Sequence, residues 1–252
     1  MRCSRRENQN SNPRVSPRLR RSPKNQLFAF LLSILAYFIG VGSMAAYFVY
    51  VQFFADQNLA PFSWYLLARN SALFLVFPLQ HSLLARSWIK NRLPSSFERS
   101  IYVATSGIAM WSVLLFWKPF GPILYRFSFP IIPNVIFYAA IFLIIATTNQ
   151  LDHWRMFGVK QGHSAWKKKD LPPSTLRTDG IFGAIRHPLT SLFIITLWSH
   201  ESMSFGRLWF NLLFTFYAFA GTIFEERDLV KNFGEDYLRY KLRVPAFLPR
   251  LR

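Results

Sequence analysis

A run of 29 residues without a charged side chain or a histidine, from Leu27 to Ala55, constrains this 252-residue chain more than any other feature. A helix rises about 1.5 Å per residue, so a helix of this length more than spans a hydrocarbon core of about 30 Å. The run is about twice as long as the apolar region of a signal peptide, which has about 7 to 15 residues. We therefore expect a membrane-spanning helix that stays in the protein.

Further apolar stretches indicate that the chain crosses the membrane several times. Hydrophobic residues make up 52% of the chain and charged residues 17%, against about 25% charged residues in soluble domains. The further stretches are Trp64–Leu84, Ile101–Trp117, Ile131–Gln150, Pro188–Trp198 and Leu208–Phe224. The stretch from Pro188 is too short to span alone, so we expect a helical hairpin over residues 188–224. The sequence predicts an all-α, polytopic membrane helix bundle with five or six spanning segments.

The positive charge of the chain is concentrated in four segments. The formal net charge is +18, and 26 of the 30 lysines and arginines lie in residues 1–26, 85–99, 151–187 and 225–252. Because cytoplasmic loops of membrane proteins carry the excess of basic residues, this distribution predicts that both termini face the cytoplasm. The excess of basic residues is then explained by the membrane topology, and we expect no nucleic-acid partner.

Residues 1–26 have the composition of a disordered, basic cytoplasmic tail. Such a tail can contact anionic lipid, with each basic residue near the surface contributing about 1 kcal/mol. A tether to nucleic acid or chromatin is the alternative. The only cysteine, Cys3, cannot form an intramolecular disulfide, and the five scattered histidines have no metal-ligand spacing. We expect no metal and no obligate protein partner.

An Arg186-His187-Pro188 triplet precedes the predicted hairpin. Proline suits the first position of a helix, so the two basic residues would lie just before a helix N-terminus at the membrane surface. Free N–H groups and the positive end of the helix dipole favour a carboxylate or phosphate there. Glu225 and Glu226 would end an apolar helix at the same membrane face. An ordinary ion pair between Arg186 and one of these carboxylates is the alternative to a ligand site.

An interfacial helix is expected to follow over residues 225–243, along the cytoplasmic membrane surface. Four apolar or aromatic residues share one face of it, at spacings of four, four and three: Leu229, Phe233, Tyr237 and Tyr240. This periodicity is typical of an amphipathic helix. Pro245 predicts its end near Val244.

Together these motifs resemble the integral-membrane methyltransferases of the isoprenylcysteine carboxyl methyltransferase superfamily. The shared features are an Arg-His-Pro at the start of a hairpin, a Glu-Glu pair, a Phe-Gly-x-x-Tyr-x-x-Tyr pattern and a Val-Pro. Three segments resemble a narrower branch, that of the methanethiol S-methyltransferases, nitrite-reduction-associated membrane proteins and nurim: Leu79–Arg86, Glu98–Tyr102 and Asp152–Gly158. The resemblance covers roughly residue 80 to the C-terminus.

The resemblance implies a methyltransferase that binds S-adenosyl-L-methionine with its C-terminal half, residues 151–252, and methylates a small thiol to a thioether. The donor site would involve Arg186, His187, Pro188, Glu225, Glu226, Tyr237 and Tyr240. Carboxylates and aromatic faces suit the sulfonium and ammonium groups of the donor. Arg186 and the helix N-terminus suit its carboxylate.

His81 is the candidate for the acceptor side, because an ionisable residue inside an apolar helix is a functional candidate by default. A histidine can take a thiol proton near neutral pH. The alternative is a structural histidine that Ser82 caps or Glu98 pairs with. Asp152 and His153, at the end of the fourth span, would either act on the acceptor or anchor the span at the interface.

The chain is thus expected to consist of the tail, a four-span N-terminal half (residues 27–150) and the donor-binding C-terminal half. Two alternative functions stay open: carboxyl methylation of a prenylated cysteine, and a non-catalytic role like that of nurim. The first half matches the thiol methyltransferase branch more closely. This favours a bacterial inner membrane over the nuclear envelope or endoplasmic reticulum.

Overall fold

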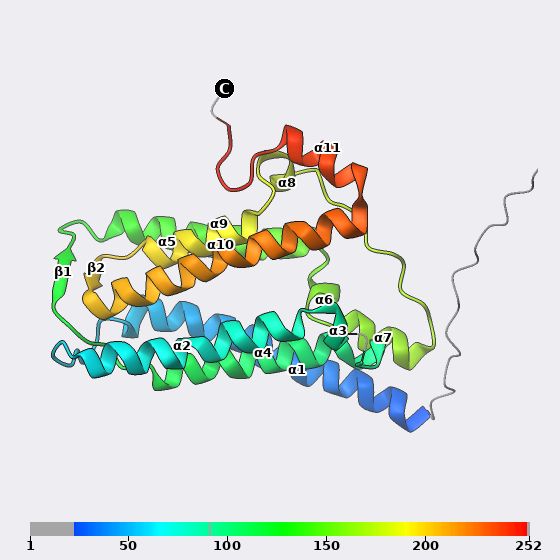
Figure 1. Ribbon diagram of the computed structural model, residues 1–252, viewed down its shortest axis with the longest axis horizontal. Coiled ribbons are helices and arrows are strands. Elements are labelled where there is room, and N and C mark those ends of the chain that lie inside the picture. The colour runs from blue at the N-terminus through cyan, green and yellow to red at the C-terminus, as the bar shows by residue number, and fades with distance from the viewer. Residues whose placement is uncertain (1–22, 91, 251–252) are drawn as a thin grey trace, which may run out of the picture.

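A computed structural model describes residues 23–90 and 92–250, which form a bundle of helices with one small sheet (Figure 1). The bundle consists of α1 (Pro23–Val49), α2 (Trp64–Leu84), α4 (Ser95–Phe116), α5 (Ile131–Gln150), α9 (Pro188–Trp198) and α10 (Phe205–Phe233). Short elements cap its ends: the π-helical turn η1 (Tyr50–Phe54), β1 (Ile123–Arg126), β2 (Ser202–Ser204), α3 (Ser87–Lys90), α6 (His153–Met156), α7 (Val159–Lys167), α8 (Ile181–Ala184) and α11 (Glu235–Arg243). The predicted all-α bundle is confirmed. Residues 1–22 of the predicted tail lie outside the described residues, and its last four begin α1.

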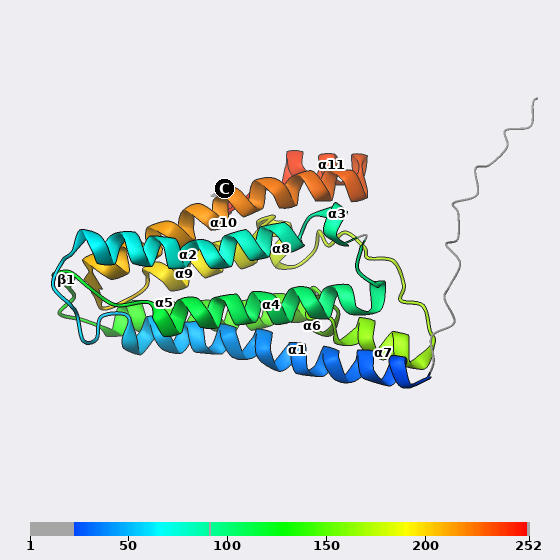
Figure 2. The ribbon, with the colours of Figure 1, turned by 60° about the horizontal axis from the view of Figure 1, so that its bottom comes forward.

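The long helices form two layers (Figure 1). Figure 2 shows α1 along one edge of the bundle, with α7 beside it. In one layer α4 packs against both α1 and α2, and in the other α9 packs against both α5 and α10. The antiparallel pair β1–β2 lies at one end of the bundle, and α7, α8 and α11 lie at the other. We call these the sheet end and the α11 end.

Four of the described helices are long and apolar enough to cross a membrane: Gln26–Phe54 (α1 with η1), Ser96–Phe116 in α4, α5 and α10. Helix α2 has 21 residues and the predicted bounds. Helix α9 has 11 residues and would rise only about 16 Å. Large apolar side chains such as Phe38, Phe142 and Phe216 are exposed on these helices. Exposed apolar surface of this extent suits contact with lipid, and the chain is a multi-pass membrane protein.

Aromatic side chains fill the space between the layers toward the sheet end. Phe74, Trp117, Phe137, Phe210 and Phe214 belong to one buried cluster that draws on both layers. The rings of Trp117 and Phe210 lie edge to face with centroids 5.0 Å apart, and so do the rings of Phe74 and Phe214. Each such contact contributes about 0.5–1.5 kcal/mol beyond the burial of area. The cluster therefore holds the two layers together at this end.

A buried ion pair closes the sheet end. The Arg207 guanidinium, at the start of α10, lies 2.8 Å from the Asp56 carboxylate, and the two side chains are only 4% and 10% exposed. Arg207 also donates to the Val51 and Ser202 carbonyl groups. Asp56 accepts from the Ser202 hydroxyl and the Ser204 amide, both in β2. The ion pair thus joins the end of the first span to the sheet and to α10.

The expected end of α10 at Glu225 is wrong. The helix continues to Phe233 and ends at Gly234, whose φ of 54° suits glycine and few other residues. Glutamate is a good helix former. Both carboxylates contact basic side chains while the helix continues, so they do not end it. The interfacial helix consequently begins at Glu235, and it ends at Arg243 as expected.

We predict that Arg207→Met destabilises the protein strongly, because the substitution leaves Asp56 buried without its partner. Breaking a buried ion pair from one side costs about 3–5 kcal/mol. For a chain of this size that corresponds to a melting temperature lower by roughly 6 to 20 °C, measured on protein purified in detergent. Arg126→Met, at an exposed position of β1, is the control and should change the stability by less than about 0.5 kcal/mol. Equal melting temperatures of the two variants would contradict this assignment.

Candidate functional site

A cavity of about 680 Å³ lies between the two layers. Its walls come from α1, α2 and α4 of one layer and from α5, α9 and α10 of the other. Its apolar and aromatic lining residues include Tyr47, Phe48, Phe77, Met110, Phe193 and Phe214. Small-molecule sites have volumes of about 300–1,000 Å³ and are mostly apolar. The space between the layers is thus filled by side chains toward the sheet end and open to a ligand toward the α11 end.

His81 lies in the cavity wall, and two hydroxyl groups contact its ring. The Tyr102 hydroxyl is 2.5 Å from Nε2, and the Ser106 hydroxyl is 3.1 Å from Nδ1. A neutral imidazole has one donor and one acceptor nitrogen. The tautomer with hydrogen on Nδ1 donates to Ser106 and accepts from Tyr102. Neither Ser82 nor Glu98, the partners of the structural alternative, bonds to the ring in the described chain.

Charged residues line the cavity toward the α11 end. Arg86 and Arg99 come from the layer of α1, α2 and α4, whereas Glu225 and Asp228 come from α10. The Arg86 guanidinium carbon lies 4.3 Å from the centroid of the Phe224 ring. The Glu225 side chain is 58% exposed. The cavity is therefore apolar in its depth and charged toward one end, which suits a ligand with a charged part and an apolar part.

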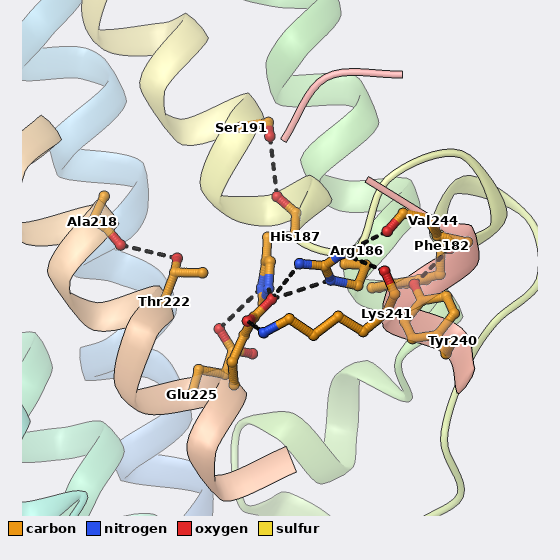
Figure 3. Close-up of polar contacts among 11 residues, drawn as sticks. Phe182, Arg186, His187, Ser191, Ala218, Thr222, Glu225, Tyr240, Lys241 and Val244 are labelled. Atoms are coloured by element: carbon orange, nitrogen blue, oxygen red, sulfur yellow. Dashed lines mark hydrogen bonds and ion pairs between the residues drawn. The ribbon is translucent and has the colours of Figure 1, made fainter. Parts of the chain in front are cut away.

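Beside the cavity, Glu226 accepts hydrogen bonds from three basic side chains (Figure 3). Nη2 and Nε of Arg186 lie 2.6 and 3.1 Å from Oε1. His187 Nε2 lies 3.1 Å from the same oxygen, and Lys241 Nζ lies 2.5 Å from Oε2. The Glu226 side chain is 16% exposed, so little water screens these charges. The alternative of an ion pair at Arg186 is thus the arrangement that the structure contains.

His187 connects the two adjacent carboxylates. Its Nδ1 lies 3.5 Å from Glu225 Oε2, and its Nε2 lies 3.1 Å from Glu226 Oε1. Carboxylates only accept hydrogen bonds, so the imidazolium form satisfies both contacts. The His187 side chain is buried, which fixes its orientation. Because it contacts Glu225 from outside the cavity, it positions that carboxylate in the cavity wall.

The segment after α11 covers the start of α9. The Arg186 and His187 amides donate to the Pro245 and Ala246 carbonyl groups at 2.9 and 3.0 Å. The Arg186 side chain donates to two further carbonyl oxygens from Nη1, those of Lys241 at 3.2 Å and of Val244 at 2.5 Å. The Arg186 donors are thus used within the protein.

Pro188 occupies the first position of α9, as predicted, and is buried. The next two residues, Leu189 and Thr190, line the cavity. The start of α9 therefore borders the cavity, although Pro188 itself is not among the lining residues.

The predicted donor-site residues Tyr237 and Tyr240 lie elsewhere. Both are buried in a cluster with Val244, outside the cavity lining, and burial raises the pKa of each to about 12. The Tyr240 hydroxyl donates to the Phe182 carbonyl at 2.6 Å. These side chains pack α11 against the loop before α9.

Asp152 and His153 do not line the cavity either. Burial would raise the pKa of Asp152, but hydrogen bonds from Lys160 and from the Arg155 amide hold it below its ordinary value. The His153 ring contacts the Tyr37 and Thr148 hydroxyls at 3.1 and 3.2 Å, and burial lowers its pKa. This arrangement matches the predicted alternative, an anchor at the end of the fourth span.

Among the predicted residues, then, the cavity contains His81 and Glu225 together. Several of its polar residues are absent from the predicted site, among them Arg86, Tyr102 and Asp228. For two of these, Tyr102 and Asp228, the helical spacing in the sequence indicates a polar helix face. Tyr102 lies between Arg99 and Ser106 at intervals of three and four residues, and Asp228 follows Glu225 by three, so each shares a helix face with other polar residues.

Comparison with known proteins finds relatives of two kinds, methanethiol S-methyltransferases and nurim. The chain is 31% identical over 188 residues to methanethiol S-methyltransferase 2 of Bradyrhizobium diazoefficiens, a match that covers 72% of this chain and 73% of the relative. It is 31% identical to methanethiol S-methyltransferase of Pseudomonas deceptionensis, over 71% of each chain. It is also 28% identical to nurim of Rattus norvegicus, over 70% of this chain and 71% of nurim. No family model and no solved structure matches the chain.

We predict that Arg186→Lys loosens the segment of residues 235–250. A lysine cannot reproduce the fork with which Arg186 bonds both Glu226 and the carbonyl groups. Losing hydrogen bonds of a charged group weakens the contact by about 1.5–3 kcal/mol, so amide hydrogen exchange in this segment should become roughly 10- to 100-fold faster.

Arg239→Lys is the matched control, because Arg239 forms an exposed pair with Asp236 in the same segment. It should leave exchange nearly unchanged. Equal exchange rates in both variants would show that Arg186 does not hold the segment.

Proposed function

Because the chain belongs to the membrane protein family of the methanethiol S-methyltransferases and nurim, we propose that it transfers a methyl group from S-adenosylmethionine to a small thiol. The observation that carries the proposal is the single cavity lined by both His81 and Glu225. A methyl transfer needs a cationic donor and a nucleophile in one enclosed space. Positioning two reactants in this way can contribute about 7–11 kcal/mol to lowering the barrier.

The charged end of the cavity fits the donor. When bound, S-adenosylmethionine supplies an electrophilic methyl group on a positively charged sulfur. Glu225 and Asp228 provide negative charge beside the rings of Tyr217 and Phe224, which also line the cavity. Carboxylates and aromatic faces both attract cations. His187, from outside the lining, holds Glu225 in place.

The His81 side of the cavity fits the acceptor. A thiol must lose its proton as its sulfur bonds to the methyl carbon, and the bond from that carbon to the donor sulfur breaks. In the tautomer with hydrogen on Nδ1, the Tyr102 hydroxyl donates to His81 Nε2 and can accept a proton at the same time, so it can pass the thiol proton to that nitrogen. In the resulting imidazolium both ring nitrogens donate, one to Tyr102 and one to Ser106. These hydroxyls therefore stabilise the charge that His81 gains.

The cavity favours His81 over Asp152 and His153 as the acceptor-side residue. One side of the His81 ring faces apolar lining, with Phe77 stacked on the ring at a centroid distance of 5.2 Å. An apolar surrounding suits a small, uncharged thiol and its thioether product. The relatives named methanethiol S-methyltransferase come from bacteria, which supports a bacterial inner membrane.

We predict that the purified protein transfers a labelled methyl group from S-adenosylmethionine to a small alkyl thiol. His81→Ala should lower the rate by about 10²–10⁴-fold, the usual contribution of a general base. Donor affinity should change little, because His81 acts on the acceptor. His163→Ala is the control, since His163 lies on α7 against Phe30 and outside the cavity. Transfer at the wild-type rate by His81→Ala would overturn the assignment.

A non-catalytic membrane protein is the second candidate, and the match to nurim favours it. The two candidate functions predict different effects of deleting residues 2–22. For the enzyme, deleting them should leave the transfer rate within about twofold of the full chain, because none of the residues assigned to the donor or the acceptor belongs to this segment. Mislocalisation of the shortened protein, together with no transfer to any thiol by the full chain, would instead support a tether.

A further inference from the structure

The cavity contains positive and negative charges that do not pair with each other. Two guanidinium groups, of Arg86 and Arg99, and two carboxylates, of Glu225 and Asp228, belong to its lining. Among the described residues, none of these guanidinium groups forms an ion pair with either carboxylate. Opposite charges in a partly enclosed space attract strongly, so leaving them apart is unfavourable unless something else lies between them. A ligand that carries both signs of charge would satisfy both groups.

Arg86 has the geometry of an unused carboxylate site. Its guanidinium carbon lies 4.3 Å from the centroid of the Phe224 ring, so the ring supports the flat side chain. Arg86 lies two residues after the end of α2 and is half-buried. In the part of the chain that the structure describes, no carboxylate pairs with it. Its five N–H groups can bind a carboxylate with two parallel hydrogen bonds.

The other arginines near the cavity either already bond other groups of the protein or lie outside the lining. Arg186 already donates to Glu226 and to two carbonyl groups. Arg99 uses its Nε on the Met156 carbonyl at 2.6 Å. Arg227 lies 5.5 Å from the same Phe224 ring but does not line the cavity. Arg86 is thus the cavity cation that is least engaged by the protein.

We propose that Arg86 binds the carboxylate of the amino-acid part of the methyl donor, while Glu225 and Asp228 bind its ammonium group. The inference rests on the proposed function and names a residue other than Arg186 for the carboxylate. Arg86 follows His81 by five residues and lies just beyond the end of α2; five residues of helix rise about 7.5 Å. Only three carbon atoms separate the carboxylate of the donor from its sulfur. The carboxylate at Arg86 therefore leaves the methyl group near His81, where the thiol would lie.

The experiment compares two ligands that differ only in the carboxylate: S-adenosylhomocysteine and its decarboxylated analogue. Affinities are measured by calorimetry on the full chain in detergent, for wild type and for Arg86→Gln. Arg86→Gln should bind S-adenosylhomocysteine about 10- to 100-fold more weakly, as expected for a lost hydrogen bond between charged groups. Its affinity for the decarboxylated analogue should equal that of wild type, which also shows that the variant is folded.

Arg227→Gln is the matched control, because it removes a charge from the same ring without touching the cavity, and it should bind both ligands as wild type does. Equal weakening of both ligands by Arg86→Gln, or no weakening of either, would overturn the inference and leave the proposed function standing. If wild type binds neither ligand, the donor assignment itself fails, and this inference fails with it.

Discussion

One carboxylate, that of Glu226, organises the α11 end of the molecule. It accepts from Arg186, His187 and Lys241, and little of it is exposed to solvent. These three partners come from the start of α9 and from α11, so a single side chain of α10 joins three elements. Without it, the Arg186 guanidinium and the Lys241 ammonium group would face each other and the His187 ring with no carboxylate between them. Such a cluster is unfavourable unless an anion of similar geometry replaces the carboxylate.

The same cluster determines what the neighbouring carboxylate can do. Since Glu226 occupies Nε2 of His187, Nδ1 remains for Glu225. One glutamate of the pair therefore supports the structure, and the other lines the cavity. Adjacent residues of a helix point about 100° apart, which explains how two identical side chains have such different surroundings.

Much of the fold follows from hydropathy, and less of the site does. The bounds of α2 and α5 agree with the predicted stretches, because an apolar run of about 20 residues has few alternatives to a spanning helix. The end of α10 does not follow from hydropathy, since Glu225 ends the apolar run without ending the helix. Gly234, whose positive φ ends α10, was the more informative signal.

For the site, the sequence predicts two residues of the cavity lining, His81 and Glu225, but it does not separate residues that line the cavity from residues that pack beside it. The Arg-His-Pro and Glu-Glu motifs do meet in space, yet Arg186 and Glu226 mainly bond each other. Tyr237 and Tyr240 recur at helical spacing because they pack against the protein, and spacing alone does not distinguish packing from ligand contact. Conversely, Arg86 has an ordinary position in the sequence. Only the arrangement of α2 beside α10 places it over Phe224 and in the cavity.

The ion pair at the sheet end also sets an order for biogenesis. Asp56 and Arg207 are separated by 151 residues, so at about 5–20 residues per second a ribosome makes the arginine roughly 8 to 30 s after the aspartate. During that interval the carboxylate has to remain in water or in the headgroup region, because a buried, unpaired charge is strongly unfavourable. The sheet end can close only when α10 arrives. The bundle helices that precede α10 must therefore wait, partly assembled, until α10 is made before the bundle becomes rigid.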